Sequence, residues 1–226
     1  MSYIGTTKIG KMFLGDVEIA KAFLGTDLVF QKGGVPPTPP TPSRLPDGYT
    51  EVEYIENTTN AWIATGVSGN LKWSLKARSN GILTQTQALV GKGTSSIIWF
   101  GVYLSTSVWG CGSTQVSNTS AFSDTTMDVV FNGKVVTATI GSDGCTRTFS
   151  SSNSSAYTLF NVGSSKQYPF IGRLYGDAVA LNGSTEVFRG VPCIDPNNVV
   201  GLYDLISNTF KSSGNSSTFV AGPAIS

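Results

Sequence analysis

Residues 127–149 read MDVVFNGKVVTATIGSDGCTRTF, and they predict three consecutive antiparallel strands. Apolar and polar residues alternate on both sides of Asn132-Gly133, which is the pattern of strands that bury one face. Asn-Gly supplies the two residues with positive φ that a type I′ hairpin turn requires. Residues 141–144, GSDG, give a second turn signal before 145–149. We therefore predict a three-strand meander.

The rest of the region 47–226 has the same character. Gly, Ser, Thr, Asn and aromatic residues are abundant, and long stretches with helical periodicity are lacking, which indicates an all-β domain with many turns. We expect its short strands to form two packed sheets, with a single helical turn at 204–207. The further strands are expected at 51–55, 61–65, 71–77, 88–90, 96–103, 157–162, 170–181, 186–189, 199–203 and 218–220.

Composition excludes several classes of function. The 226 residues carry a formal net charge of +1, and only 13% of them are charged. A nucleic-acid-binding protein would carry a basic patch or stripe, and binding to an anionic membrane surface would need a cluster of basic residues. No apolar run reaches the length of a membrane span, and Met1-Ser2-Tyr3 lead into a repeat without a signal-peptide pattern. We expect neither nucleic acid nor membrane as a partner.

Residues 3–30, YIGTTKIGKMFLGDVEIAKAFLGTDLVF, contain three copies of one unit. The copies align on Gly5, Gly15 and Gly25, so the period is ten residues. This period suits one short strand and a turn in each repeat.

Both faces of these predicted strands carry apolar side chains, whereas a solvated hairpin is polar on one face. Chains below roughly 40 residues seldom bury two apolar faces without a disulfide, a metal or a partner. We therefore predict that residues 1–32 form a homo-oligomer, a trimer, and attach the chain to a larger assembly. The alternative is that they pack on the protein's own second domain. The predicted contact residues are Ile9, Phe13, Leu14, Ile19, Phe23 and Leu24.

Residues 33–46, GGVPPTPPTPSRLP, predict a proline-rich linker. Proline fixes φ and removes a backbone donor, so such a segment favours extended polyproline II and acts as a semi-rigid spacer. The predicted organisation is an attachment repeat at 1–32, a linker at 33–46 and a β-sandwich at 47–226.

The opening stretch 45–55, LPDGYTEVEYI, is followed by WIATG at 62–66. Together with FIGRLY at 170–175 and VGLYD at 200–204, it resembles concanavalin A-like, or laminin-G-like, jelly-roll domains. Such domains occur in virion proteins of tailed phages and in surface proteins of gut bacteria. The N-terminal repeat and the linker resemble attachment modules of phage fibres. The resemblance implies a jelly-roll domain in a virion protein, assembled in the bacterial cytoplasm and contacting other virion proteins through its N-terminus.

Catalysis has little support in the sequence. Members of the family that cleave glucans carry a Glu-x-Asp-x-Glu strand, which this chain lacks. The chain has no histidine, which excludes Ser-His-Asp and Cys-His arrangements. Glu51 and Glu53 share one face of a predicted strand, where we interpret them as a solvated edge. We expect no enzymatic activity, and a glycan-cleaving enzyme resting on isolated carboxylates is the least favoured alternative.

Calcium is a second feature that the resemblance brings. Its sites need several oxygen ligands close together, whereas the aspartates of this chain stand singly; 195–198, DPNN, reads as turn chemistry. We therefore expect no cofactor; calcium is the alternative, which no motif supports. Cys111, Cys145 and Cys193 fit no metal motif. We expect all three to be buried free thiols. The alternative is one disulfide, and the sequence does not indicate which two cysteines would form it.

Glycan binding is the remaining site hypothesis. Sugar rings present C–H faces that stack on aromatic rings, and nearby hydroxyl and amide groups bind their hydroxyls. Trp99, Tyr103 and Trp109 lie in a stretch rich in Ser and Thr. Trp99 and Tyr103 share one face of a predicted strand, and Phe100 and Val102 share the other. One face should be core and the other should face outward, and each tryptophan is either a ligand residue or a core residue.

The sequence therefore predicts a non-enzymatic fibre protein of the virion that displays a glycan-binding domain toward the host surface. The alternative is a head or tail decoration protein that binds no glycan.

Overall fold

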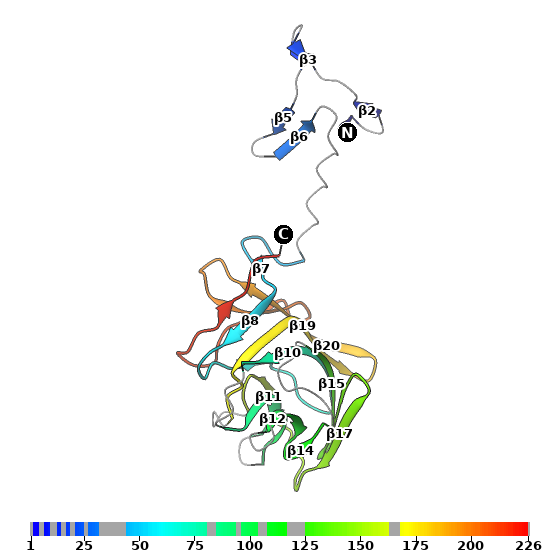
Figure 1. Cartoon of the computed structure of the whole chain (residues 1–226), viewed down its shortest axis with the longest axis vertical. Coiled ribbons are helices and arrows are strands. Elements are labelled where there is room, and N and C mark those ends of the chain that lie inside the picture. The colour runs from blue at the N-terminus through cyan, green and yellow to red at the C-terminus, as the bar shows by residue number, and fades with distance from the viewer. Residues whose placement is uncertain are drawn as a thin grey trace. The chain divides into compact units, whose positions relative to one another are not determined.

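The computed structural model describes residues 44–80, 85–93, 96–103, 108–116, 125–162 and 168–225 in full, together with the backbone of six short strands between residues 2 and 31. The chain divides into two compact units, Met1–Arg44 and Leu45–Ser226. The boundary lies inside the segment that the sequence predicts to be a linker. Figure 1 shows that both units are built from strands.

The described backbone of the first unit forms three hairpins. The innermost residue pairs are Ile4–Thr7, Leu14–Val17 and Leu24–Asp27, so pairing repeats with the period of the sequence. Each repeat therefore contributes two short strands instead of the expected one. The side chains of the six predicted contact residues lie outside the described part. The strands are β1 Ser2–Ile4, β2 Thr7–Ile9, β3 Phe13–Leu14, β4 Val17–Glu18, β5 Lys21–Leu24 and β6 Asp27–Gln31.

The second unit contains an eleven-stranded sheet in which all pairs are antiparallel. The central order is β17-β16-β15-β10-β19-β20-β21-β22; in addition, β8 pairs with β19, β23 pairs with β8, and β7 pairs with β20. Its strands are β7 Thr50–Glu51, β8 Tyr54–Asn57, β10 Lys72–Ser79, β15 Thr125–Asn132, β16 Val135–Ile140, β17 Asp143–Thr148, β19 Gly172–Asn182, β20 Thr185–Ile194, β21 Val200–Asp204, β22 Thr209–Lys211 and β23 Val220–Ala221.

A six-stranded sheet forms the other layer, in the order β14-β13-β12-β11-β18-β9. The two sheets enclose one hydrophobic core, to which both contribute their inward side chains. The unit is thus an all-β sandwich, as the sequence predicts. Its strands are β9 Ile63–Ala64, β11 Gln87–Lys92, β12 Ile98–Tyr103, β13 Val108–Cys111, β14 Thr114–Gln115 and β18 Tyr157–Leu159.

Large apolar side chains fill the space between the sheets. Trp73 on β10 lies 5.5 Å from the ring of Tyr157 on β18 and 5.5 Å from that of Phe188 on β20, measured between ring centroids. All three side chains are fully buried. Trp73 thus contacts one ring of its own sheet and one ring of the facing sheet. Burial of a side chain of this size stabilises the fold by roughly 1.5–3 kcal/mol.

The predicted meander is confirmed as β15, β16 and β17, but its first turn is shifted by one residue. Asn132 pairs with Val135, so the turn residues are Gly133 and Lys134, and of these Gly133 has positive φ. A leading glycine is typical of a type II′ turn, not of the type I′ turn that Asn-Gly predicts. The observed register places Phe131 opposite Val136. A turn at Asn132-Gly133 would place it opposite Lys134, so pairing of apolar side chains selects the register.

The predicted helical turn at 204–207 is wrong. Asp204 pairs with Thr209, and the residues between them form the loop of the hairpin β21–β22. Asn208 in this loop has a φ of 52°, a conformation that Asn tolerates better than most residues. No residue of the described part is helical, and none of the described segments is an apolar helix that could span a membrane.

Candidate ligand-binding pocket

The alternation of β12 assigns its two faces. Phe100 and Val102 point into the core and are fully buried. Trp99 and Tyr103 have the opposite parity and lie on the outer face of the six-stranded sheet, where Trp99 packs with Ala88 and Val162. The structure therefore brings together two of the three residues predicted to bind a glycan.

Trp99 and Tyr103 line a pocket of about 180 Å³, which we call the Trp99 pocket. The pocket lies where β17, an edge strand of the large sheet, contacts β14, an edge strand of the small sheet. Its walls combine aromatic rings, hydroxyl groups and one guanidinium group. The lining residues are Thr86, Trp99, Tyr103, Gly112, Ser113, Arg147, Phe149 and Tyr168.

Tyr168 forms the exposed aromatic wall of the pocket. Its ring centroid lies 5.8 Å from that of Trp99, with 43° between the ring planes, and the residue is 37% exposed. The backbone of Tyr168 has a φ of 60°, which costs a non-glycine residue roughly 1–3 kcal/mol. The Ala88 N–H donates a hydrogen bond of 2.8 Å to the Tyr168 carbonyl and holds this conformation. The fold thus maintains a strained backbone that places an aromatic ring at the pocket.

Arg147 supplies the positive charge of the pocket. Its guanidinium carbon lies 5.0 Å from the ring centroid of Phe149, and its Nη1 donates a hydrogen bond to the hydroxyl of Ser113. The guanidinium crosses over Gly112, where a Cβ atom would come within 2.9 Å of Nη1. Gly112 also has a φ of 57°, which favours glycine. The Arg147 side chain is therefore fixed on three sides by stacking, hydrogen bonding and close backbone contact.

Trp109 is a core residue, which corrects its predicted role as a glycan ligand. It is 0% exposed, stacks on Phe100 at 5.7 Å between centroids, and also stacks on Phe170. Trp109 pairs with Val102 across β12 and β13, and residues opposite each other in antiparallel strands share a face. Its ring therefore has no face free for a sugar.

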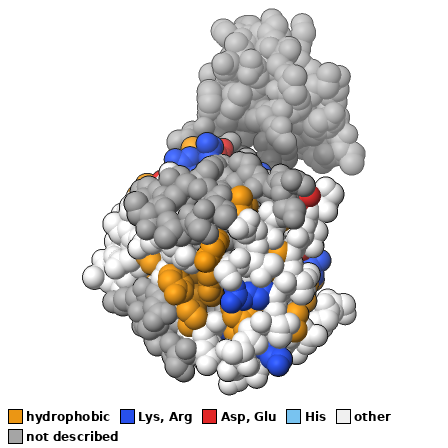
Figure 2. Space-filling model, turned by 60° about the horizontal axis from the view of Figure 1, so that its bottom comes forward, with side chains coloured by type: hydrophobic (Ala, Val, Ile, Leu, Met, Phe, Trp, Pro, Cys, Tyr) orange, Lys and Arg blue, Asp and Glu red, His pale blue; other side chains and the backbone are white. Residues whose placement is uncertain are grey.

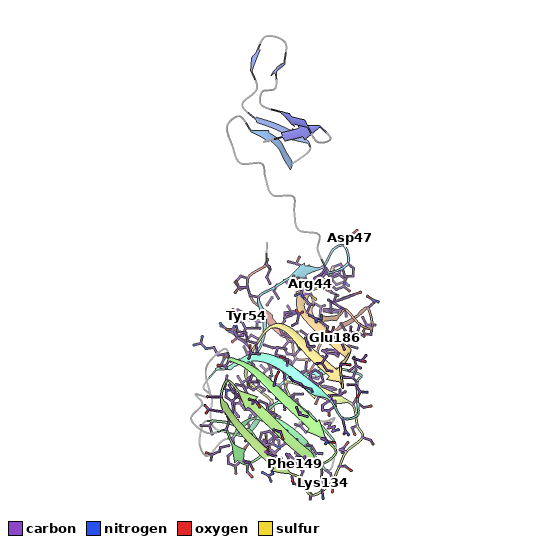
Figure 3. The ribbon with its side chains drawn as sticks, turned by 90° about the vertical axis from the view of Figure 1, so that its right-hand side faces the viewer. Arg44, Asp47, Tyr54, Lys134, Phe149 and Glu186 are labelled. Carbon is purple, nitrogen blue, oxygen red and sulfur yellow. The ribbon has the colours of Figure 1, made fainter. Side chains whose placement is uncertain are left out.

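The chain ends of the sandwich lie away from the Trp99 pocket. In Figure 3 Phe149 and Lys134 lie at the end of the second unit opposite Asp47. The C-terminal segment returns to the Asp47 end, because the Ile225 N–H donates a hydrogen bond of 2.9 Å to the Glu51 carbonyl. Figure 2 turns the pocket end forward and shows hydrophobic side chains gathered there next to Lys and Arg side chains.

A second pocket, of about 370 Å³, lies between the loop that precedes β21 and the segment that follows β22. Among the described residues that line it, Phe219 is the one aromatic residue, and its ring is 3% exposed. The remaining lining residues are Asn198, Val199, Val200, Ser212, Ser213, Asn215, Ser216, Ser217 and Thr218. This pocket therefore offers hydroxyl and amide groups without an aromatic face for stacking.

Several carboxylates of the second unit have structural partners. Arg189 forms ion pairs with Glu186 at 2.6 Å and with Asp177 at 2.9 Å, and its hydrogen bonds hold the pKa of Glu186 below its usual range. Asp195 accepts hydrogen bonds from the N–H groups of Asn197 and Val199, which confirms the predicted turn chemistry. Among the fully described segments, no cluster of three potential metal ligands occurs.

Two of the three cysteines lie close together beside the Trp99 pocket. The Sγ atoms of Cys111 on β13 and Cys145 on β17 are 2.7 Å apart, and both residues are buried free thiols. Cys193 belongs to a separate cluster with Leu45, Val191 and Tyr203. The three cysteines are free thiols, as expected, and Cys111 and Cys145 are the two whose sulfur atoms lie close together.

Sequence reasoning missed Arg147, Phe149 and Tyr168. Arg147 and Phe149 share parity in CTRTF at 145–149, so the strand pattern places them on one face. No local signal connects that strand with Trp99, because their proximity arises from the meeting of two sheet edges. Tyr168 stands in a loop where its φ, not its sequence context, sets the direction of the ring.

Comparison with known proteins adds no relationship: no protein-family model matches the chain, and no curated protein matches its sequence. The fold and the pocket therefore define the second unit as an antiparallel β-sandwich with an aromatic pocket at one end.

Proposed function

We propose that this chain is a fibre protein of a tailed-phage virion and that its sandwich is a jelly-roll domain of the concanavalin A-like kind that binds carbohydrate on the host surface. The Trp99 pocket carries this proposal. Tyr168 and Tyr103 present aromatic surface suited to the C–H face of a sugar ring, while Trp99, which is 6% exposed, packs behind them. Thr86 and Ser113 offer hydroxyl groups for the hydroxyls of the sugar. A volume of about 180 Å³ suits a single sugar residue of a longer chain.

The position of the pocket supports display. Both chain ends of the sandwich lie at the end that carries Asp47, so attachment through the N-terminus leaves the pocket end free. One small pocket binds weakly by itself. Several tethered copies raise the effective concentration, and avidity can then exceed the affinity of one site by about 10²–10⁴.

The proposed protein acts by binding and not by catalysis. Asp177 and Glu186 are held by Arg189, and within the described segments no carboxylate lines the Trp99 pocket. The proposed partners are copies of this chain in a trimer, other virion proteins through residues 1–32, and host-surface glycans.

Binding of the full-length protein to a panel of bacterial surface polysaccharides tests this function. We expect saturable binding that Tyr168→Ala and Tyr103→Ala each weaken at least tenfold, because each removes an aromatic wall while the backbone bond of Tyr168 remains. Tyr175→Ala is the matched control, since Tyr175 lies on β19 against Tyr54, on the other sheet. A folded oligomer that binds nothing across the panel would favour the decoration protein instead.

A further inference from the structure

We propose that the Trp99 pocket is specific for a sugar residue that carries a carboxylate, such as a hexuronic acid, and that Arg147 binds this carboxylate. The inference rests on the proposed glycan-binding function and names the chemical class of its ligand.

The first observation is that Arg147 is held in place before a ligand arrives. Phe149 stacks on the guanidinium at 5.0 Å, the Ser113 hydroxyl accepts a hydrogen bond from Nη1, and Gly112 lets the group lie against the backbone. A long flexible side chain loses rotamer freedom when it binds a ligand. The contacts of Arg147 have already imposed that loss, so its remaining N–H donors are preorganised for an acceptor.

The second observation is the charge of the pocket. Among the described residues, Arg147 is the one charged residue of the lining, and the others are aromatic rings, Thr86, Ser113 and Gly112. A guanidinium carries five N–H donors and no acceptor. In the part of the chain that the structure describes, Ser113 is the hydrogen-bond partner recorded for Arg147, and no carboxylate forms an ion pair with it. The pocket therefore provides a positive charge that a bound anion would neutralise.

The third step distinguishes a carboxylate from other acceptors. The planar fork of a guanidinium matches a carboxylate in a bidentate pair, which is stronger than a bond to a neutral hydroxyl. Tyr168 and Arg147 line the same pocket, so a carboxylate on a pyranose ring that faces Tyr168 lies toward Arg147. A neutral sugar would leave the guanidinium without an anion.

A matched pair of polysaccharides tests the inference with the full-length protein. The first is a polymer of glucuronic or galacturonic acid residues, and the second is the same polymer after chemical reduction of its carboxyl groups to primary alcohols. We expect the acidic polymer to bind at least tenfold more tightly, and Arg147→Gln to abolish this preference. Arg147→Lys keeps the charge but loses the planar fork, so it should recover only part of the preference.

Lys134→Gln is the control variant, because it removes an exposed positive charge at the same end of the domain but outside the pocket lining. It should keep the preference, and thermal unfolding should show all variants folded. Equal binding of both polymers, unaffected by Arg147→Gln, would overturn the carboxylate inference and leave the glycan-binding function intact. Preference for a sulfated polymer over the carboxylated one would likewise overturn it. Failure of every polymer to bind would overturn the glycan-binding function as well.

Discussion

Trp109 shows how one side chain of the predicted site serves the core. Its indole stacks between Phe100 and Phe170, and its Nε1 is buried with no hydrogen-bond partner in the structure described. We expect Trp109→Ala to lower the free energy of unfolding by about 3–5 kcal/mol, because it leaves a large cavity. Trp109→Phe should cost less, since it keeps a stacked ring and removes the unpaired donor.

Urea unfolding monitored by circular dichroism measures both changes. Tyr103→Ala is the comparison, because Tyr103 lies on the outer face of the same sheet and its loss should cost much less stability. An unfolding free energy of Trp109→Ala equal to that of the wild type would contradict the placement of this residue in the core.

At the same scale, the sequence predicts part of the pocket and no more. Period-2 alternation correctly separates Trp99 and Tyr103 from Phe100 and Val102, because successive side chains of a strand point to opposite faces. Alternation does not determine which face is buried, since both faces of β12 carry apolar residues. Which face of β12 points into the core depends on where the large sheet packs against it. That packing is tertiary structure, which the local pattern does not encode.

At the scale of elements, local turn signals locate hairpins better than they locate strand ends. The alternation of residues 127–149 correctly predicts the meander β15–β17. The strand predicted at 186–189, by contrast, ends too early, because β20 continues past Pro192 to Ile194. The Pro192 carbonyl accepts a hydrogen bond of 3.0 Å from Val52, at the break between β7 and β8. The N and O of one strand residue point to the same side. The missing N–H of proline therefore faces an interrupted edge, where no regular ladder bond is lost.

A cross-link between β13 and β17 is the prediction at the scale of elements. We expect oxidised glutathione to convert Cys111 and Cys145 to a disulfide, because their sulfur atoms are 2.7 Å apart. One protein thiolate attacks glutathione disulfide and expels one glutathione thiolate; the second protein thiolate then displaces the other, and the two glutathione thiolates take up the two protons of the protein thiols. Closing this loop of 34 residues should raise the free energy of unfolding by about 2–4 kcal/mol.

Intact mass should fall by two hydrogen atoms, and peptide mapping should link Cys111 to Cys145. Cys193 serves as the internal control, because it belongs to another cluster and lies away from the pair. Cys193→Ser should still form the cross-link, whereas Cys145→Ser should not. A map that links Cys193 to either partner, or three free thiols after prolonged oxidation, would contradict the pairing.

At the scale of the whole molecule, the second unit contains everything that its own folding requires. Its core draws on both sheets, and every residue of that core lies between Val52 and Ala221. Its two chain ends are joined at one end of the sandwich by the pairing of Val52 with Ala224. We therefore expect residues 33–226 to fold without the N-terminal repeat, so that removal of the repeat tests attachment separately from folding.

Deletion of residues 1–32 should convert an oligomer, expected to be a trimer, into a monomer. The repeat carries apolar residues at both parities, and about 30 residues seldom bury two apolar faces within one chain. Light scattering measures the mass, and circular dichroism should show an unchanged sandwich. Binding to a glycan-coated surface should weaken by about 10²–10⁴, while the affinity for a single soluble oligosaccharide stays constant, because the deletion removes avidity and not the pocket. A deletion variant with the mass of the full-length assembly would show that the sandwich itself oligomerises and that the repeat serves another contact.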